Sequence, residues 1–226
     1  MEISVIIPVY NQARAIKKCL AAIFSQTFKD LEVIIVNDGS TDNLRAVLRP
    51  YETRAKIFHQ TNGGAPAARN FGLAQSQGRY VIFCDADIVM KPDMLEKMYR
   101  LLERKNAFAY AYCSFKMGWK KFKLWPYDAA KLKQAPYIHS TSLMRREVCP
   151  GWDENLKKFQ DWDLWLTIAE KGGLGVFIPE VLFTIKARGT MSHWLPKFFY
   201  KFGWLKTVKK YNEAKKIIFE KHGLTA

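Results

Sequence analysis

The strongest constraint on the fold is an alternation of short β-branched runs with helical patterns over the first hundred residues. Short runs rich in Val and Ile predict strands, whereas apolar residues spaced three and four apart predict one face of a helix. The predicted strands cover residues 3–9, 31–36, 56–58 and 80–84, and the predicted helices include Ile16, Leu20 and Ile23 and residues 66–77. Because the strands carry few polar residues, we expect an α/β fold with a mostly parallel sheet covered by helices on both faces.

The length of 226 residues, without an internal repeat or a Pro/Gly/Ser-rich linker, predicts a single domain. From about residue 108 the alternation gives way to aromatic and lysine-rich sequence, and we expect a loop or an irregular region over 115–133. A helix over 161–171 and two short strands, near residue 176 and over 181–185, should follow. The chain lacks a membrane-spanning run and the layout of a signal peptide, so we expect a cytoplasmic protein.

The formal net charge of +15 indicates an anionic partner. From Lys186 onward ten Lys and Arg residues stand against two Glu, so this tail carries over half of the excess. Its apolar residues recur at helical spacing from Trp194 to Val208, which predicts a basic amphipathic helix. Such a helix either lies on an anionic membrane or packs on the domain. Patterns typical of nucleic-acid-binding modules are absent, so we expect no nucleic-acid partner.

Carboxylates stand where two of the predicted strands end. Asp38 closes the second strand before a glycine turn, and it either accepts hydrogen bonds from a nucleobase or belongs to an ordinary turn, in which Ser40 or Asp42 caps the next helix. Asp85 and Asp87 follow the fourth strand. Ligands of parallel sheets bind at the carboxyl ends of strands, and paired carboxylates there suit Mn²⁺ or Mg²⁺ shared with phosphate oxygens. The alternative is a polar turn.

Five motifs together resemble the family 2 glycosyltransferases in order and spacing. They are residues 4–11 (SVIIPVYN), 36–42 (VNDGSTD), the stretch from Gly64 through Arg69 and Asn70 to Gly72, 85–87 (DAD) and 160–166 (QDWDLWL). The resemblance implies the GT-A fold, with a nucleotide-binding half over 1–107, an acceptor half over 108–190 and the basic helical tail over 191–226. It also implies transfer of a sugar, with inversion, from a nucleoside diphosphate donor.

The resemblance assigns site residues by position. Asp161 would be the general base, Asp87 would hold the metal, and Asp85 would face the ribose or the sugar. Pro8, Val9 and Tyr10 would line the base pocket, Asp38 would hold the base imide, and Arg69 would lie between the base and the acids. His139, Arg188 and His193 are candidate contacts to the acceptor or the diphosphate. The family commonly has Glu before the base, whereas this chain has Gln160.

The sequence therefore predicts a metal-dependent inverting glycosyltransferase. We expect a UDP-sugar donor and, as acceptor, a cell-envelope glycan or a lipid-linked molecule, with peripheral contact to the inner face of the membrane. Two alternatives stay open. Gln160 is compatible with an inactive nucleotide-sugar-binding protein, and a sugar nucleotidyltransferase would share the broad fold, although its usual glycine-rich loop is replaced here by residues 8–11.

Overall fold

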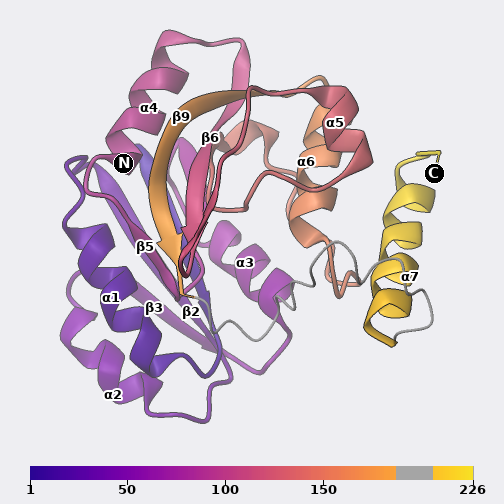
Figure 1. The fold of residues 1–226 in the computed structure, drawn as a ribbon. Coiled ribbons are helices and arrows are strands. Elements are labelled where there is room, and N and C mark those ends of the chain that lie inside the picture. The colour runs from indigo at the N-terminus through magenta and orange to yellow at the C-terminus, as the bar shows by residue number, and fades with distance from the viewer. Residues whose placement is uncertain (187–205, 226) are drawn as a thin grey trace.

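The computed structural model of the chain describes residues 1–186 and 206–225. Within these residues nine strands form one mixed sheet with the order β3-β2-β1-β4-β8-β6-β9-β5, and β7 pairs with β6 (Figure 1). The strands are β1 Ile3–Val9, β2 Leu31–Asp38, β3 Lys56–Gln60, β4 Tyr80–Phe83, β5 Ile88–Met90, β6 Phe108–Met117, β7 Lys120–Phe122, β8 Leu143–Arg145 and β9 Leu174–Ile185. The helices are α1 Ala13–Phe24, α2 Leu44–Leu48, α3 Ala65–Ala74, α4 Met94–Arg104, α5 Ala129–Gln134, α6 Gln160–Glu170 and α7 Lys206–Lys221.

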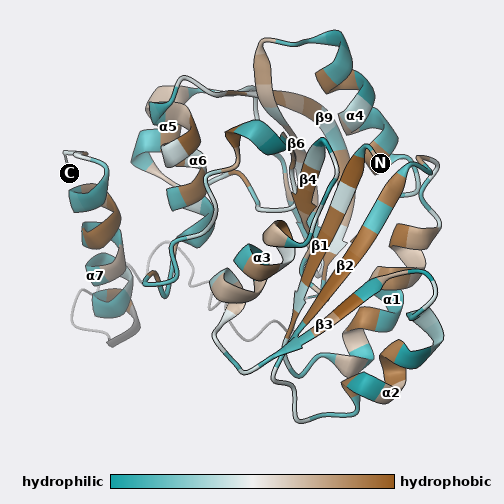
Figure 2. Cartoon of the chain, turned by 180° about the vertical axis from the view of Figure 1, so that it is seen from behind, coloured by the Kyte–Doolittle hydropathy of each residue, from teal (hydrophilic) through white to brown (hydrophobic). Residues whose placement is uncertain are grey.

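The central strands are buried on both faces, as their composition predicts (Figure 2). Alternate side chains of β1 point to opposite faces of the sheet, so Ile7 packs in the core with α1 and α4, whereas Ile6 packs in the core with α6. Helix α3 packs closely on the sheet, because a Cβ on Gly72 would lie 2.5 Å from the Ile6 side chain. Helices therefore cover the sheet on both sides and leave the strand ends free to carry polar groups.

One edge of the sheet collects the carboxyl ends of six strands. Strands β1, β2, β3 and β4 are parallel, as the sequence predicts. Strand β8 is antiparallel to both β4 and β6, and β9 is parallel to β6. Strands β6 and β9 therefore run in the same direction as β1. Asp38, the residues after β4, and the ends of β6 and β9 consequently lie along the same edge, which we call the carboxyl edge.

Two sequence predictions for the second half are wrong. Residues 115–133 are not one loop, because β6 extends to Met117 and β7 and α5 follow. Aromatic residues along β6 pack in the hydrophobic core of the domain. This packing stabilises the strand and outweighs the preference of the neighbouring lysines for a solvated loop. The strands expected near 176 and over 181–185 form the single strand β9, whose pairing to β6 shifts register between Ile178 and Val181, where Pro179 cannot donate to the ladder.

The described part of the tail packs on the domain. Val208 and Ile218 of α7 are buried, and Lys221 Nζ lies 2.6 Å from a carboxylate oxygen of Asp153 and 2.7 Å from one of Asp163. This favours the packed alternative for α7. The segment 194–205 of the predicted amphipathic helix lies outside the described residues. Among the described residues, no helix combines the length and apolar character needed to cross a bilayer.

Glu32 ties the sheet to the turn before β4. Its side chain is 3% exposed and accepts hydrogen bonds from Ser4 Oγ at 2.7 Å, from Gln77 N–H at 2.6 Å and from Lys56 Nζ at 2.8 Å. Burial acts to raise the pKa of Glu32, but these hydrogen bonds outweigh it and hold the pKa below its ordinary value. The ionised form is thus favoured by folding, and its contribution to stability is lost as the pH falls through the lowered pKa.

We expect Glu32→Gln to lower the free energy of unfolding at neutral pH by about 1–3 kcal/mol, because charged hydrogen bonds are replaced by neutral ones. For a domain of this size that corresponds to a fall in Tm of roughly 3–10 °C. Thermal unfolding followed by circular dichroism from pH 7 to pH 3 measures the effect. The difference between wild type and variant should shrink at the acid end, and a difference that is constant across this range would contradict the assignment.

Candidate active site

The acidic cluster follows β4. Asp85 Oδ1 lies 2.7 Å from a guanidinium nitrogen of Arg69, which α3 directs toward the strand end. Burial acts to raise the pKa of Asp85, but the charge and hydrogen bond of Arg69 outweigh it and hold the pKa below its ordinary value. Asp85 is therefore an ionised carboxylate whose charge is already compensated by the protein.

Asp87 lies two residues farther on, and no salt bridge to its carboxylate occurs within the residues that the structure describes. Burial, and then the negative charge of Asp85, raise the pKa of Asp87. No cluster of three or more His, Cys, Asp or Glu side chains suited to a metal ion occurs among residues 1–186 and 206–225. One uncompensated carboxylate beside a second one fits Mn²⁺ or Mg²⁺ that takes its remaining ligands from phosphate oxygens and water. The residues present therefore fit a metal that binds together with a diphosphate.

Arg69 connects this cluster to α6. The side chain of Arg69 is 3% exposed, its Nη1 donates to Gln160 Oε1 at 3.3 Å, and its guanidinium carbon lies 4.3 Å from the ring centroid of Trp152. Gln160 thus occupies the position beside the arginine and accepts a hydrogen bond there without adding a second negative charge. Three segments distant in sequence meet at this one guanidinium.

Asp161 lies in the first turn of α6, where the helix dipole favours a carboxylate. Its Oδ2 accepts a hydrogen bond from the Ser140 N–H at 2.9 Å, so it binds the neighbouring segment instead of capping its own helix. The Nε1–H groups of Trp162 and Trp165 donate to the carbonyls of Leu132 and Ile138 at 2.6 and 3.0 Å. These anchors fix the start of α6 and hold the Asp161 carboxylate in place.

The backbone directly before α6 is strained. Phe159 has φ of +60°, a left-handed conformation that bulky residues seldom adopt. Its ring packs edge-on against Trp162 and Tyr211, which compensates for the cost of this conformation. Phe159 thereby sets the direction from which Gln160 and Asp161 enter the site, a role that the sequence does not signal.

The predicted base pocket lies at the ends of β1 and β2. Pro8 and Val9 are buried, whereas Tyr10 is 48% exposed and offers a ring to solvent. The Asp38 carboxylate is 2% exposed and accepts hydrogen bonds from Gln60 Nε2, Gly63 N–H and Gly64 N–H at 2.8, 2.8 and 2.9 Å. Since a carboxylate can accept about four hydrogen bonds, one acceptor position is left for a base. The role of Asp38 toward a base stays a prediction.

The turn after β2 also organises the start of α1. Asp42 Oδ2 accepts a hydrogen bond from the Ala13 N–H at 2.8 Å, whereas α2 begins after Asn43 without a side-chain cap. The prediction that Ser40 or Asp42 caps the following helix is therefore wrong. The Asp42 side chain accepts its hydrogen bond from the first residue of the earlier helix, α1, and no side chain caps α2. Asn11, with φ of +52°, accepts hydrogen bonds from the Thr41 and Asp42 N–H groups through its side-chain oxygen.

His139 lies beside the acids. A positive charge on its ring would act to lower the pKa of Asp85 and would oppose the rise in the pKa of Asp87. The ring lies between those of Phe115 and Phe183, with centroids 5.5 and 5.3 Å away. Its Nδ1 accepts a hydrogen bond from the Thr141 N–H at 3.0 Å, which leaves the proton of the neutral ring on Nε2. The structure thus brings His139 into the site, while Arg188 and His193 lie outside the described residues.

Two residues that the sequence reasoning missed complete the site. Trp152 packs against Arg69, and the Ser140 N–H holds Asp161. Trp152 is one of seven tryptophans and follows no predicted strand, so its position in the sequence did not identify it as a site residue. Ser140 directly follows His139, a candidate contact, but the sequence assigned no role to Ser140 itself.

Comparison with known proteins places this geometry in a family. The model of Glycosyl transferase family 2 matches residues 4–157. The chain is 36% identical over 109 residues to glycosyltransferase GlyG of Streptococcus pneumoniae, covering 46% of this chain and 36% of that protein. It is 30% identical over 192 residues to an uncharacterized glycosyltransferase of Rickettsia conorii, covering 77% of this chain and 31% of that protein. The chain thus spans about a third of the length of these curated relatives.

Solved structures share the fold. S. aureus TarS in complex with UDP-GlcNAc superposes with a TM-score of 0.74 at 20% identity, covering 89% of this chain and 64% of that chain. The mannosyltransferase PcManGT from Pyrobaculum calidifontis, in complex with GDP-Man and Mn²⁺, gives 0.66 at 20% identity, covering 85% and 58%. The predicted GT-A fold is confirmed, and the family match disfavours the nucleotidyltransferase alternative. With its strand-end acids, its helix-borne Asp161 and a family model that matches most of its length, this chain belongs to glycosyl transferase family 2.

Proposed function

We propose that the chain transfers a sugar, with inversion and with Mn²⁺ or Mg²⁺, from a nucleoside diphosphate sugar to a hydroxyl group of a cell-envelope glycan or a lipid-linked acceptor. The observation that carries the proposal is the Arg69 bridge. It joins the strand-end carboxylate Asp85 to Gln160, the residue directly before Asp161. These contacts support the proposal, because they link the proposed diphosphate site to the candidate base through one side chain. We propose further that the reaction takes place at the inner face of the cell membrane.

A nucleoside diphosphate sugar is the donor class that this edge of the sheet suits. TarS has been solved with UDP-GlcNAc and PcManGT with GDP-Man and Mn²⁺, and both share the fold. In this chain Tyr10 offers an exposed ring for stacking on a base, and Asp38 offers its remaining acceptor position to a base N–H. A uracil imide donates one such N–H, which favours a UDP-sugar.

Two carboxylates have different roles in the proposed reaction: Asp87 acts at the leaving group and Asp161 acts at the acceptor. Asp87 would hold the divalent ion, which supplies positive charge to the departing diphosphate when bound. Asp161 accepts the proton of the acceptor hydroxyl as its oxygen attacks the anomeric carbon from the side opposite the diphosphate. Opposed base and leaving group give inversion, by the same geometry that separates inverting from retaining hydrolases. The His139 Nε2–H is free to donate to a phosphate or sugar oxygen.

Donor binding should depend on the metal and on Asp87. We expect a UDP-sugar with Mn²⁺ to raise Tm by about 5–10 °C at a concentration near 100 times its Kd. Asp87→Asn should abolish this shift, and it should raise the Tm of the free protein slightly, because it removes the repulsion from Asp85. A thermal-shift screen of UDP-, GDP- and dTDP-sugars, with and without Mn²⁺, measures both effects.

The matched control is Asp93→Asn. The Asp93 carboxylate lies at the start of α4 and pairs with Lys97 Nζ at 2.7 Å. It should retain the full ligand-induced shift. If no nucleotide sugar stabilises the wild type in the presence of Mn²⁺, the proposed donor class is wrong. An Asp87→Asn protein with an undiminished shift would reject the metal assignment.

A further inference from the structure

The hairpin of β6 and β7 projects an unpaired aromatic residue. Trp119 lies at its turn and is 94% exposed, the largest exposure among the bulky apolar side chains of the described residues. The turn depends on Gly118, whose φ is +57°. Below it, Phe122 stacks on Phe115 with centroids 4.9 Å apart and ring planes 6° apart. The base of the hairpin is thus fixed by packing, whereas Trp119 contributes nothing to the core.

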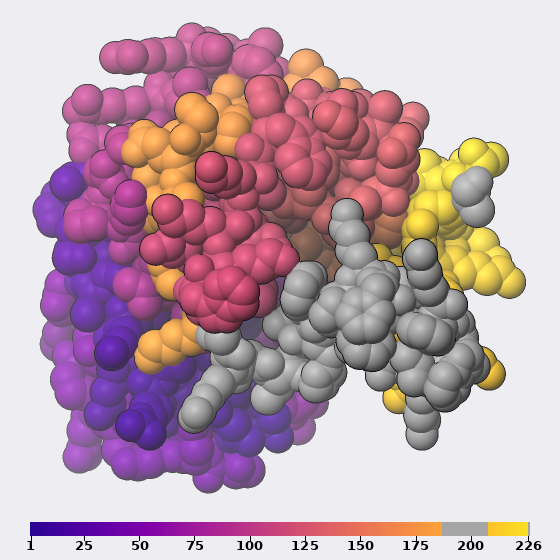
Figure 3. All heavy atoms as spheres, viewed as in Figure 1, coloured from indigo at the N-terminus to yellow at the C-terminus, as the bar shows by residue number. Residues whose placement is uncertain are grey.

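The hairpin is also strongly basic. We define the basic hairpin as residues 116–123, which contain Lys116, Lys120, Lys121 and Lys123, and no acidic residue occurs from 116 to 127. Lys121 and Lys123 are exposed, and the hairpin stands at the surface of the face shown in Figure 3. An exposed tryptophan surrounded by lysines has the composition of a membrane-interface contact, with the ring at the headgroup level and the ammonium groups on lipid phosphates.

Two backbone hydrogen bonds connect the basic hairpin to the candidate metal residue. The Gly118 N–H donates to the Ile185 carbonyl at 3.1 Å, and the N–H of Lys186, the next residue, donates to the Asp87 carbonyl at 3.3 Å. The hairpin therefore borders the site at the carboxyl edge. A surface that contacts the basic hairpin would lie directly against the mouth of the site.

We propose that the basic hairpin docks the carboxyl edge on an anionic lipid bilayer, so that the acceptor hydroxyl is presented by a membrane lipid or a lipid-linked glycan. The inference rests on the proposed function and narrows its acceptor class. Charge complementarity supports a bilayer, because the eight residues of the basic hairpin hold four lysines and an exposed tryptophan and no acidic side chain. The hairpin, as well as any contribution of the tail, would then set the orientation of the enzyme on the membrane.

The test is flotation of the full chain with vesicles of phosphatidylcholine alone or mixed with phosphatidylglycerol. We expect binding to the mixed vesicles and little binding to the neutral ones. The triple variant Lys116→Gln, Lys121→Gln, Lys123→Gln should weaken binding to mixed vesicles by about 100-fold, since each lysine near an anionic surface contributes roughly fivefold. Trp119→Ala should weaken it by about tenfold through loss of its buried apolar area.

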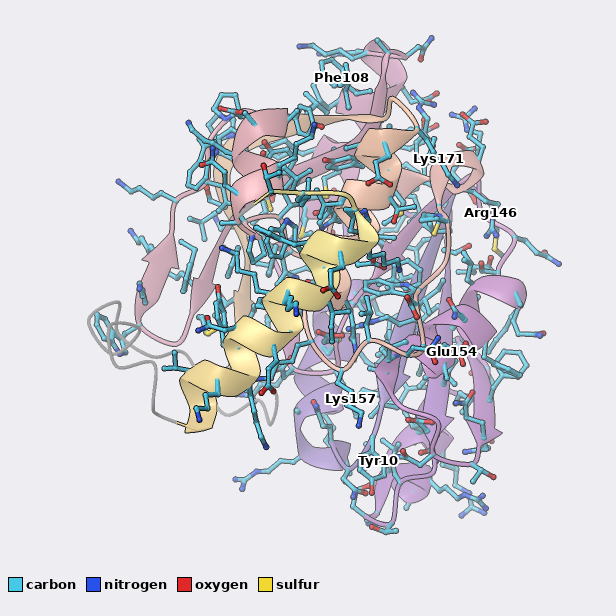
Figure 4. The ribbon with its side chains drawn as sticks, turned by 90° about the vertical axis from the view of Figure 1, so that its right-hand side faces the viewer. Tyr10, Phe108, Arg146, Glu154, Lys157 and Lys171 are labelled. Atoms are coloured by element: carbon cyan, nitrogen blue, oxygen red, sulfur yellow. The ribbon has the colours of Figure 1, made fainter. Side chains whose placement is uncertain are left out.

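Matched controls lie at the opposite edge of the sheet. Lys29, Lys105 and Lys171 are exposed and precede the amino ends of β2, β6 and β9. Figure 4 shows Lys171 and Tyr10 toward opposite ends of the molecule. Replacing Lys29, Lys105 and Lys171 together by Gln makes the same change in net charge as the hairpin triple variant. This control variant should weaken vesicle binding far less. Leu174→Ala, at a side chain 43% exposed, is the control for Trp119→Ala and should have no effect.

Equal loss of binding in the two lysine triples would overturn the proposal, as would unchanged binding in both hairpin variants or equal binding to both kinds of vesicle. The Mn²⁺-dependent shift caused by a UDP-sugar, measured without vesicles, should be intact in every hairpin variant. Failure of vesicle binding with that shift retained rejects the docking surface alone, whereas absence of the shift in the wild type rejects the proposed function.

Discussion

Asp161→Asn is expected to lower kcat for sugar transfer by about 10²–10⁴-fold, the range typical of removing a general base. The amide keeps the shape of the side chain, and its oxygen can still accept the Ser140 N–H, so the start of α6 should be preserved. The lost property is the ability to take a proton from the acceptor hydroxyl. Release of nucleoside diphosphate from a UDP-sugar, measured with a coupled assay over a range of donor concentrations, gives kcat and KM.

Because the proposed role of Asp161 is toward the acceptor, the affinity for the donor should not change. The Mn²⁺-dependent thermal shift caused by the UDP-sugar should be the same in the variant and the wild type. Asp128→Asn is the matched control, since Asp128 caps α5 through the Lys131 N–H and Asn caps helices equally well. Equal activity of Asp161→Asn and wild type would remove Asp161 from the mechanism. A wild type with no detectable turnover would favour the inactive nucleotide-sugar-binding alternative.

Arg69→Met should have the largest effect on stability, with a loss of about 2–4 kcal/mol, because removing one partner of a buried pair leaves the other charge uncompensated. The value lies toward the lower end of such losses, since the Asp85 side chain is 33% exposed and water partly solvates it. A fall in Tm of roughly 5–15 °C follows. The loss of positive charge should also raise the pKa of Asp85, which Arg69 now holds low.

A double-mutant cycle separates the pair from general packing. Asp85→Asn combined with Arg69→Met should be less destabilising than the sum of the two single changes, because no unpaired charge remains. Arg69→Lys serves as the charge-preserving control and should lose the contacts to Gln160 and Trp152 while keeping the compensation of Asp85. Strict additivity in the cycle would show that Arg69 and Asp85 do not act as a pair.

The first half of the fold could be predicted because local and long-range signals agree there. The β-branched runs of β1, β2 and β4 are buried on both faces, and a polar residue follows each apolar run within two positions. Parallel strands bring their carboxyl ends to one edge, so the sequence positions of Asp38, Asp85 and Asp87 were sufficient to place them there. Their detailed environments were not predictable, since Asp38 is held by a loop more than twenty residues away.

The second half was harder because tertiary packing decides its structure. Strand β6 combines an aromatic core face with a lysine near its end, and pairing with β7, β8 and β9 turns that sequence into ten residues of strand. The Arg69 bridge joins residues 91 positions apart in the chain, a distance at which no sequence pattern operates. Gln160 departs from the family motif, and the structure shows that its side-chain oxygen accepts a hydrogen bond from Arg69.

The most direct test of the proposed mechanism is the configuration of the sugar first released from an α-linked UDP-sugar with Mn²⁺, followed by proton NMR before mutarotation. With Asp161 and the diphosphate on opposite sides of the anomeric carbon, the wild type should release the β-anomer first, and Asp161→Asn should release almost none. Initial release of the α-anomer, or release of the β-anomer at the same rate by both proteins, would contradict the account.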